Sequence, residues 1–168
     1  MNKKIARKYL LSFSLMLVIT LLFMAGACWL IVREYPTEGK SNFYIVKNEA
    51  MRVAGVIGVI LSTPWLLAII KSIVLLFCDF ISNETIACDL EIGSDLEFHL
   101  PRHSFYVVDS FCFKNKIMIY LFMFWAYVFK RSYYFLDMEM ANVKDLRQKK
   151  KVHMMATKYA HIVLSISQ

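Results

Sequence analysis

The sequence has few of the residues that break regular structure, with five glycines and three prolines among 168 residues. No Gly/Ser-rich linker, low-complexity tract or internal repeat divides the chain. It also lacks a nucleophile elbow, a Gly-rich phosphate loop and a Cys–His pair in a catalytic context. We therefore expect no enzyme, no catalytic residue and no cofactor.

Metal-binding patterns are also missing. The four cysteines, at positions 28, 78, 88 and 112, have no CxxC spacing, which fits neither a disulfide scaffold nor a zinc site. His99 and His103 are four residues apart, a spacing that joins two imidazoles only on a helix. Pro101 and the alternating residues around it indicate a strand, so we expect two solvated histidines near a turn and no metal.

Apolar residues are abundant and unevenly placed. They make up 58% of the chain, against about 45–50% in soluble domains. They gather in two long runs near the N-terminus and one shorter run further on. This distribution is typical of a membrane anchor rather than of a rich soluble core.

The first run, Leu10–Val32, has no charged residue over 23 positions. A helix of that length measures about 34 Å, enough for a hydrocarbon core of about 30 Å. Basic residues precede it, as in a signal peptide, but the apolar region of a signal peptide is about 7–15 residues long. We therefore expect an uncleaved transmembrane helix.

The second run reads from Val53 to Ile70, is interrupted by Lys71, and resumes as far as Cys78. Its first eighteen residues span about 27 Å, a minimal crossing that would leave Lys71 at the membrane face. In the alternative the helix continues to Cys78 and Lys71 is an intramembrane charge. Gly55 and Gly58 would allow close packing against the first helix near residues 25–27.

Charge placement predicts the orientation of this helical hairpin. Four basic residues in the first eight favour a cytoplasmic N-terminus, and two crossings return the C-terminus to the cytoplasm of a plasma membrane. The external loop carries four basic residues of its own, which opposes this orientation, whereas Lys71 and the C-terminal basic run support it. The expected parts are a basic N-terminus (1–9), transmembrane helices (10–32 and 53–78), an external loop (33–52) and a β-rich cytoplasmic domain (79–168).

The β-rich part begins with a period of two. Apolar residues alternate with polar ones over Ile86–Ile92 and again over Leu96–Leu100, which indicates two half-buried strands. Gly93-Ser94 between them suits a tight hairpin turn. The outward acidic residues of that hairpin would form a solvated row: Asp89, Glu91, Asp95 and Glu97. Further strands are expected at 105–113, 133–140 and 159–166.

The third apolar run, Ile117–Phe129, is flanked by basic residues on both sides. Its thirteen residues are too few for a comfortable crossing. Three interpretations stay open: a buried strand that turns into a short helix, a segment lying against the membrane, and a third transmembrane helix.

Two transmembrane helices followed directly by a small β-rich domain resemble bacterial membrane proteins with a cytoplasmic pleckstrin-homology-like domain. KIMIYLFMFWAYVFK, residues 116–130, is similar to their I-x-Y-x-D-I-x-W-x-Y pattern through Tyr120, Trp125 and Tyr127. An apolar residue, Phe122 or Met123, stands where an acidic one is usual. Residues 152–166 read as two strands joined at Thr157-Lys158, like the last hairpin of such domains. The resemblance implies a tethered module that binds lipids or protein segments.

The net charge of +7 points to the bilayer as a partner, because no nucleic-acid recognition motif accompanies it. The basic run at 144–151 is either a contact for anionic headgroups or a solvated face. Candidate anionic-lipid contacts are Lys130, Arg131, Lys144, Arg147, Lys149, Lys150 and Lys151. Residues expected at the membrane interface are Lys3, Lys4, Arg7, Lys8 and Lys71.

Two functions are compatible with this organisation. The first is a membrane-anchored binding or scaffold module whose β-domain recognises a lipid headgroup or a segment of another membrane protein. The second is a transport accessory or membrane-protection protein of the immunity type, which acts through its helices. The sequence leaves the ligand and the oligomeric state open.

Overall fold

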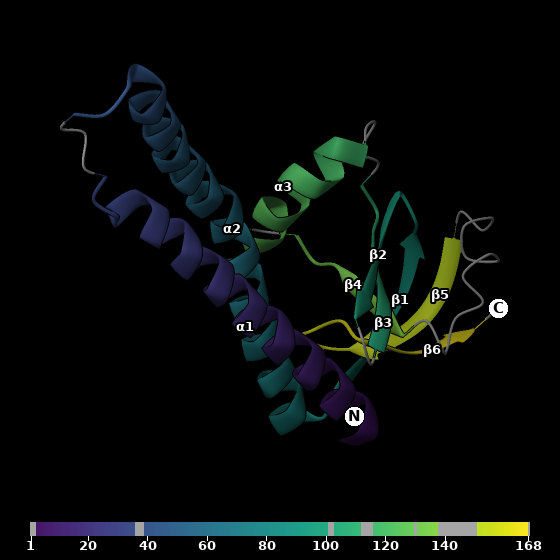
Figure 1. Ribbon diagram of the computed structural model, residues 1–168. Coiled ribbons are helices and arrows are strands. Elements are labelled where there is room, and N and C mark those ends of the chain that lie inside the picture. Colours follow the sequence, from purple (N-terminus) through teal and green to yellow (C-terminus); the bar gives the residue numbers. More distant parts are fainter. Residues whose placement is uncertain are drawn as a thin grey trace.

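A computed structural model describes residues 3–35, 39–100, 103–111, 116–129, 131–137 and 151–167. Two long helices come first, α1 (Lys3–Val32) and α2 (Asn42–Ser82), and lie side by side as an antiparallel pair (Figure 1). Both are long and apolar enough, by length and composition, to cross a membrane. The elements that follow are β1 (Thr85–Glu91), β2 (Ser94–Leu100), β3 (His103–Asp109), α3 (Lys116–Phe129), β4 (Tyr134–Asp137), β5 (Lys151–Thr157) and β6 (Val163–Ser167).

α2 is longer than the apolar run that predicted it. It begins at Asn42, so residues 42–52, which we expected in an external loop, are helical. No glycine or proline occurs in that stretch, whereas Gly39, with φ of +68°, turns the chain just before it. At its other end the helix passes Lys71 without interruption and stops at Ser82. Asn83 then closes it in the left-handed conformation, and its N–H donates to the Asp79 carbonyl.

Small residues set the distance between α1 and α2. A Cβ on Gly55 would lie 2.7 Å from the carbonyl oxygen of Ala27, and one on Gly58 would lie 3.2 Å from the Ala27 Cβ. The expected close packing at this level is confirmed. Apolar helices in lipid associate through such close approaches, because burial of apolar surface gives little driving force there.

The six strands form two antiparallel sheets. The outer sheet has the order β1-β5-β6, and the inner sheet has the order β2-β3-β4. The two sheets meet at a bridge between Phe135 and Ile162. We call the six strands together the β unit.

The predicted hairpin of β1 and β2 is wrong, because these strands belong to different sheets. The turn at Gly93 passes the chain from the outer sheet to the inner one. Its N–H donates to the Asp109 carbonyl at 2.8 Å, and a Cβ there would lie 2.6 Å from the Ser110 carbonyl oxygen. Only glycine permits this approach of two backbones. The sequence correctly predicted a turn at Gly93, but it did not predict that the turn joins two different sheets.

The central strand of the inner sheet is buried on both faces. On β3, Phe105 and Val107 pack with the helices, whereas Tyr106 and Val108 pack with the outer sheet. The molecule therefore has three layers: helices, inner sheet and outer sheet (Figure 1). β1, at the outside, keeps the alternating burial of a half-buried strand, as predicted.

The remaining strands lie close to their expected positions. β3 and β4 fall at or near residues 105–113 and 133–140, although 112–115 and 138–150 lie outside the described residues. β5 and β6 pair antiparallel around residues 158–162, which confirms the expected final hairpin.

The third apolar run is helical throughout, as α3, so of the three open interpretations the one that begins with a strand is wrong. Its 14 residues measure about 21 Å, too short for a core of about 30 Å. Met123, Phe124 and Tyr127 are buried, while Phe122 and Phe129 are exposed. This is the period of a helix, which an all-apolar run conceals in the sequence.

Gly55→Ala tests the close approach of the helix pair. The added methyl group would meet a backbone carbonyl, and such overpacking costs about 1–3 kcal/mol, more than the ~1 kcal/mol that alanine gains in a helix. We expect a lower Tm in detergent. Gly26→Ala is the matched control, because a Cβ there meets nothing within 4 Å, and its Tm should be unchanged or higher. Equal Tm values for the two variants would contradict this packing.

Candidate functional site

Aromatic rings fill the junction where the helices meet the inner sheet. Phe13 of α1 lies 5.9 Å from Phe105 and 5.6 Å from Phe135, measured between ring centroids. Both pairs are edge-to-face, the geometry that the ring quadrupoles favour. Trp65 of α2 stacks on Phe124 of α3 at 4.0 Å. α1, α2 and α3 are thus all held to one face of the same sheet.

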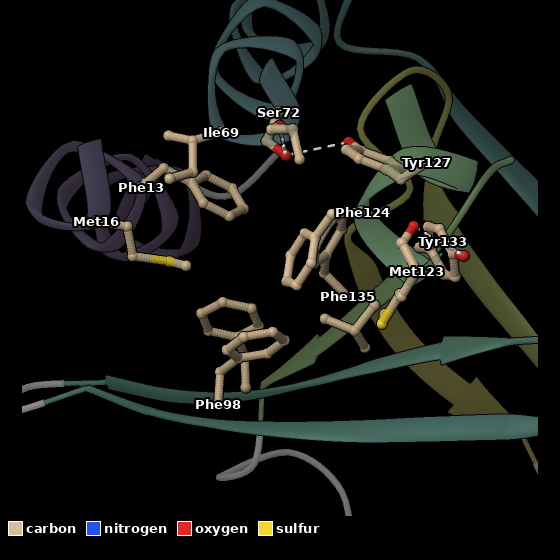
Figure 2. Close-up of a pocket in the computed structure, with 13 residues that line it drawn as sticks. Phe13, Met16, Ile69, Ser72, Phe98, Met123, Phe124, Tyr127, Tyr133 and Phe135 are labelled. Atoms are coloured by element: carbon tan, nitrogen blue, oxygen red, sulfur yellow. Dashed lines mark hydrogen bonds between the residues drawn. The ribbon is translucent and has the colours of Figure 1, made fainter. Parts of the chain in front are cut away.

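A small cavity remains inside this junction (Figure 2), with a volume of about 40 Å³. Phe13, Met16 and Ile69 face it from the helix pair, and Phe98 faces it from the inner sheet. Its lining is almost wholly apolar, and the cavity is partly open to its surroundings. It holds no nucleophile and base in contact, so it offers room for small movements of side chains rather than for chemistry.

One polar pair borders the cavity. The hydroxyls of Ser72 and Tyr127 lie 3.1 Å apart, and Ser72 also donates to the Ala68 carbonyl at 2.9 Å. Burial raises the pKa of Tyr127 to about 12. The phenol is therefore neutral at physiological pH, and the pair joins α2 to α3 without adding a charge.

Lys71 lies at the same junction, against α3. Its ammonium donates to the Tyr127 carbonyl and sits 4.4 Å from the centroid of the Tyr127 ring. That carbonyl belongs to the last turn of α3, where backbone oxygens lack helical partners and the helix dipole favours a cation. The sequence placed Lys71 at a membrane face; its contact with α3 had no sequence signal.

A second hollow, a groove of about 410 Å³, opens between the two long helices and the end of β2. Its hydroxyls are already satisfied, because Thr20 donates to the Met16 carbonyl and Ser62 to the Gly58 carbonyl. The groove therefore offers a mainly apolar surface. It is lined by Met16, Ile19, Thr20, Phe23, Leu61, Ser62, Trp65 and Phe98.

Asp79 joins the end of α2 to the β unit. The residue is 1% exposed, and its two carboxylate oxygens accept the backbone N–H groups of Tyr159 and Ala160 at 2.8 and 2.7 Å. A carboxylate in the last turn of a helix faces the unfavourable end of the helix dipole. These two charge-assisted bonds therefore offset both that cost and the cost of burial.

His161 follows in the same turn. It has a positive φ of 53° and stacks on Tyr134 with ring centroids 5.0 Å apart. Burial lowers the pKa of His161, with a smaller contribution from the positive charge of Lys71, while the Asp79 carboxylate and a hydrogen bond to the Lys158 backbone partly oppose the shift. The folded protein therefore favours the neutral imidazole.

A polar cluster lies near the start of α1. The ammonium of Lys8 is 3.4 Å from the carboxylate of Asp137, and Nδ1 of His103 is 3.9 Å from the same group. The ring of Tyr9 meets His103 edge-on at 5.0 Å. His103 is therefore buried, and the expectation of a solvated histidine is wrong for it because α1 covers that end of the inner sheet.

His99 is exposed, as expected, and lies 2.7 Å from the Glu97 carboxylate. The predicted row of acidic side chains is divided between the sheets, since Asp89 and Glu91 lie on β1 and face His153 and Lys151 on β5. Among the described residues, no group of three or more His, Cys, Asp or Glu side chains could hold a metal ion.

The predicted lipid contacts fall in different surroundings. Arg131 pairs with Asp109 at 2.6 Å and covers the Phe111 ring at 3.8 Å. Lys151 and Arg7 are exposed, while Lys3 and Lys4 lie in the first turn of α1. Lys130, Lys144, Arg147, Lys149 and Lys150 lie outside the described residues. The structure thus gives Arg131 a protein partner, which the sequence did not indicate.

Comparison of the chain with protein-family models, with curated proteins and with solved structures gave no match.

The turn at His161 predicts a pH-dependent stability. Because the folded state disfavours the charged imidazole, the unfolded chain binds a proton near pH 6.5 that the folded protein does not. The contribution of His161 to the free energy of unfolding is constant above about pH 7.5 and decreases as the pH falls below about 6.5. We expect Tm in detergent to drop between pH 7 and pH 5. His161→Asn tolerates the positive φ and should make that drop smaller; an identical pH profile would refute the assignment.

Proposed function

We propose that this chain is a membrane-anchored binding or scaffold module, with the β unit displayed on the cytoplasmic side of the plasma membrane. α1 and α2 cross the bilayer, and both termini are cytoplasmic. The observation that carries the proposal is the continuous packing of helices, inner sheet and outer sheet. A β unit built onto its anchor in this way presents the outer sheet at a fixed distance and orientation from the membrane.

The exposed face of the outer sheet is the surface offered to a partner. Glu91 lies opposite Lys151, and Asp89 lies opposite His153 and bonds to it. Met155 adds an apolar centre that is 44% exposed. Paired charges on the same face as an apolar residue suit a segment of a protein better than a single anionic group. We expect anionic headgroups to bind the basic residues nearer the bilayer instead.

The resemblance to pleckstrin-homology-like membrane proteins supports the same class of function. Two antiparallel sheets follow a pair of apolar helices in this chain, and that domain type binds lipids or protein segments. A pleckstrin-homology-like fold of the β unit is part of the proposal.

The alternative is a transport accessory or membrane-protection protein that acts through its helices. The groove between α1 and α2 favours it, because an apolar hollow of about 410 Å³ lies within the size range of small-molecule sites, about 300–1,000 Å³. The two functions differ in the surface that meets a partner: the outer sheet in the first, the groove in the second.

A photo-crosslinking amino acid at Met155 or at Ile19 separates the two. Replacing both helices with an unrelated pair would not separate the two functions, because Tyr9 and Phe13 of α1 belong to the core that packs on the inner sheet. Met155 marks the outer sheet and Ile19 the groove, and both are exposed. In living cells we expect a discrete protein adduct with a cytoplasmic partner at Met155. We expect only lipid adducts at Ile19.

Lys151→Glu provides the control, because it reverses one charge on the same face of β5 as Met155 and should weaken the adduct. A protein adduct at Ile19 alone would support the helix-acting alternative and refute the binding module. An adduct at Met155 with a protein from the outer side of the membrane would overturn the orientation.

A further inference from the structure

The apolar surface of the helix pair continues past the level at which the β unit begins. On α2, Ile70, Val74, Phe77 and Ile81 are all exposed, Phe77 by 64% and Ile81 by 70%. Their spacing of four, three and four residues places them on one face of the helix. The opposite face, with Ile69, Ser72, Leu76 and Asp79, is buried. This part of α2 therefore has one face against protein and one open apolar face.

α1 behaves in the same way at this level. Leu10, Leu11 and Leu15 are exposed, whereas Tyr9 and Phe13 pack into the junction with the inner sheet. Both helices thus carry an open apolar face on the side away from the β unit. We call this the back face, formed by Leu10, Leu11, Leu15, Ile70, Val74, Phe77 and Ile81.

α3 carries a second open apolar surface. Phe122 and Phe129 are exposed, and Trp125 stacks on Phe129 with ring centroids 5.7 Å apart. These three residues share one side of the helix by their spacing. The chain has no acidic residue between Asp109 and Asp137, and the basic residues of that stretch flank α3 at both ends: Lys114, Lys116, Lys130 and Arg131.

The outer sheet carries exposed polar side chains instead. Asp89, Glu91, Lys151, His153 and Ser165 are all exposed there. The outer sheet is the layer furthest from the helices (Figure 1). These polar side chains therefore lie on the side of the molecule away from the helices.

We propose that one bilayer covers both the back face and the outer side of α3, with the helix pair tilted and α3 at the boundary between headgroups and acyl chains. This seating rests on the proposed membrane anchoring and adds to it the depth and tilt of the chain. The β unit then lies in the angle between the tilted helices and α3, with its outer sheet turned to water.

Length supports a tilt. From Val53 to Ile81, 28 steps of about 1.5 Å give an exposed apolar face about 42 Å long, against a hydrocarbon core of about 30 Å. An upright helix would leave about 12 Å of that face in water. A tilt of about 40° shortens the projection of that face on the bilayer normal to about 32 Å, close to the thickness of the core.

Residue type favours lipid over a second copy of the chain. Helix contacts inside membranes use small residues, as Gly55 and Ala27 do within this pair. The back face instead carries large branched and aromatic side chains, the kind that suits acyl chains. Arg131 is paired with Asp109, but the lysines at 114, 116 and 130 suit anionic headgroups by their place in the sequence. An apolar helix between cations fits a position in the interface.

Fluorescence quenching by spin-labelled lipids tests the seating. The full chain, with its four cysteines replaced by alanine, receives one new cysteine with an environment-sensitive fluorophore. The sites are Phe77→Cys on the back face, Phe129→Cys on α3, Ile57→Cys in the half of α2 far from the β unit, and Ser165→Cys on the outer sheet. Vesicles contain phosphatidylcholine, phosphatidylglycerol and lipids labelled at carbon 5 or carbon 12 of the acyl chain.

We expect the deep label to quench Ile57→Cys most and the shallow label to quench Phe129→Cys most, each at least twofold. Phe77→Cys should be quenched by lipid labels, and Ser165→Cys only by aqueous iodide. Absence of lipid quenching at Ile57→Cys would refute membrane anchoring itself. Quenching at Ile57→Cys without quenching at both Phe77→Cys and Phe129→Cys would refute the seating alone. Shielding of Phe77→Cys from both lipid and iodide would indicate a protein partner and would also overturn it.

Discussion

The buried carboxylate of Asp79 connects the two parts of this protein. It leaves the last turn of α2 and accepts two backbone N–H groups of the turn between β5 and β6. That turn sets the position of Ile162, which is fully buried and forms the bridge to Phe135 between the two sheets. The end of the helix pair thus fixes the turn, and the turn fixes how the outer sheet meets the inner one.

This connection, together with the burial of the central strand of the inner sheet on both faces, makes the helix pair part of the core rather than a separate anchor. Phe105 packs with α1, while its neighbour Tyr106 packs with the outer sheet. Any tilt of the helices is therefore transmitted to the outer sheet as a whole. For a binding module this means that the bilayer determines the direction in which the recognition surface points. For a protein that acts through its helices, it means that the β unit holds the groove in shape.

The sequence predicted the elements that depend on a local pattern of residues. It did not predict the features that depend on contacts between residues distant in the chain. The two helices followed from charge-free runs, and β1 followed from alternation because one of its faces meets solvent. β3 has no such alternation, since both faces are buried. The turn at Gly93 was recognised from its residue type, but the choice between a hairpin and a crossing of sheets depends on β5, about sixty residues away. The contacts of Lys71 and Asp79 had no local signal, because each partner is distant in the chain.

Hydrogen exchange of the full-length Asp79→Ala variant tests the central connection most directly. Loss of two charge-assisted bonds leaves two buried N–H groups unsatisfied, a cost of about 3 kcal/mol. We predict exchange about a hundredfold faster in residues 158–162 and in β4 and β6, with no change where α1 and α2 meet at Gly55. Asp89→Ala is the matched control, because that carboxylate is exposed at the surface, and its exchange should equal that of the unmodified protein. Unchanged protection of β4 and β6 in Asp79→Ala would contradict the account.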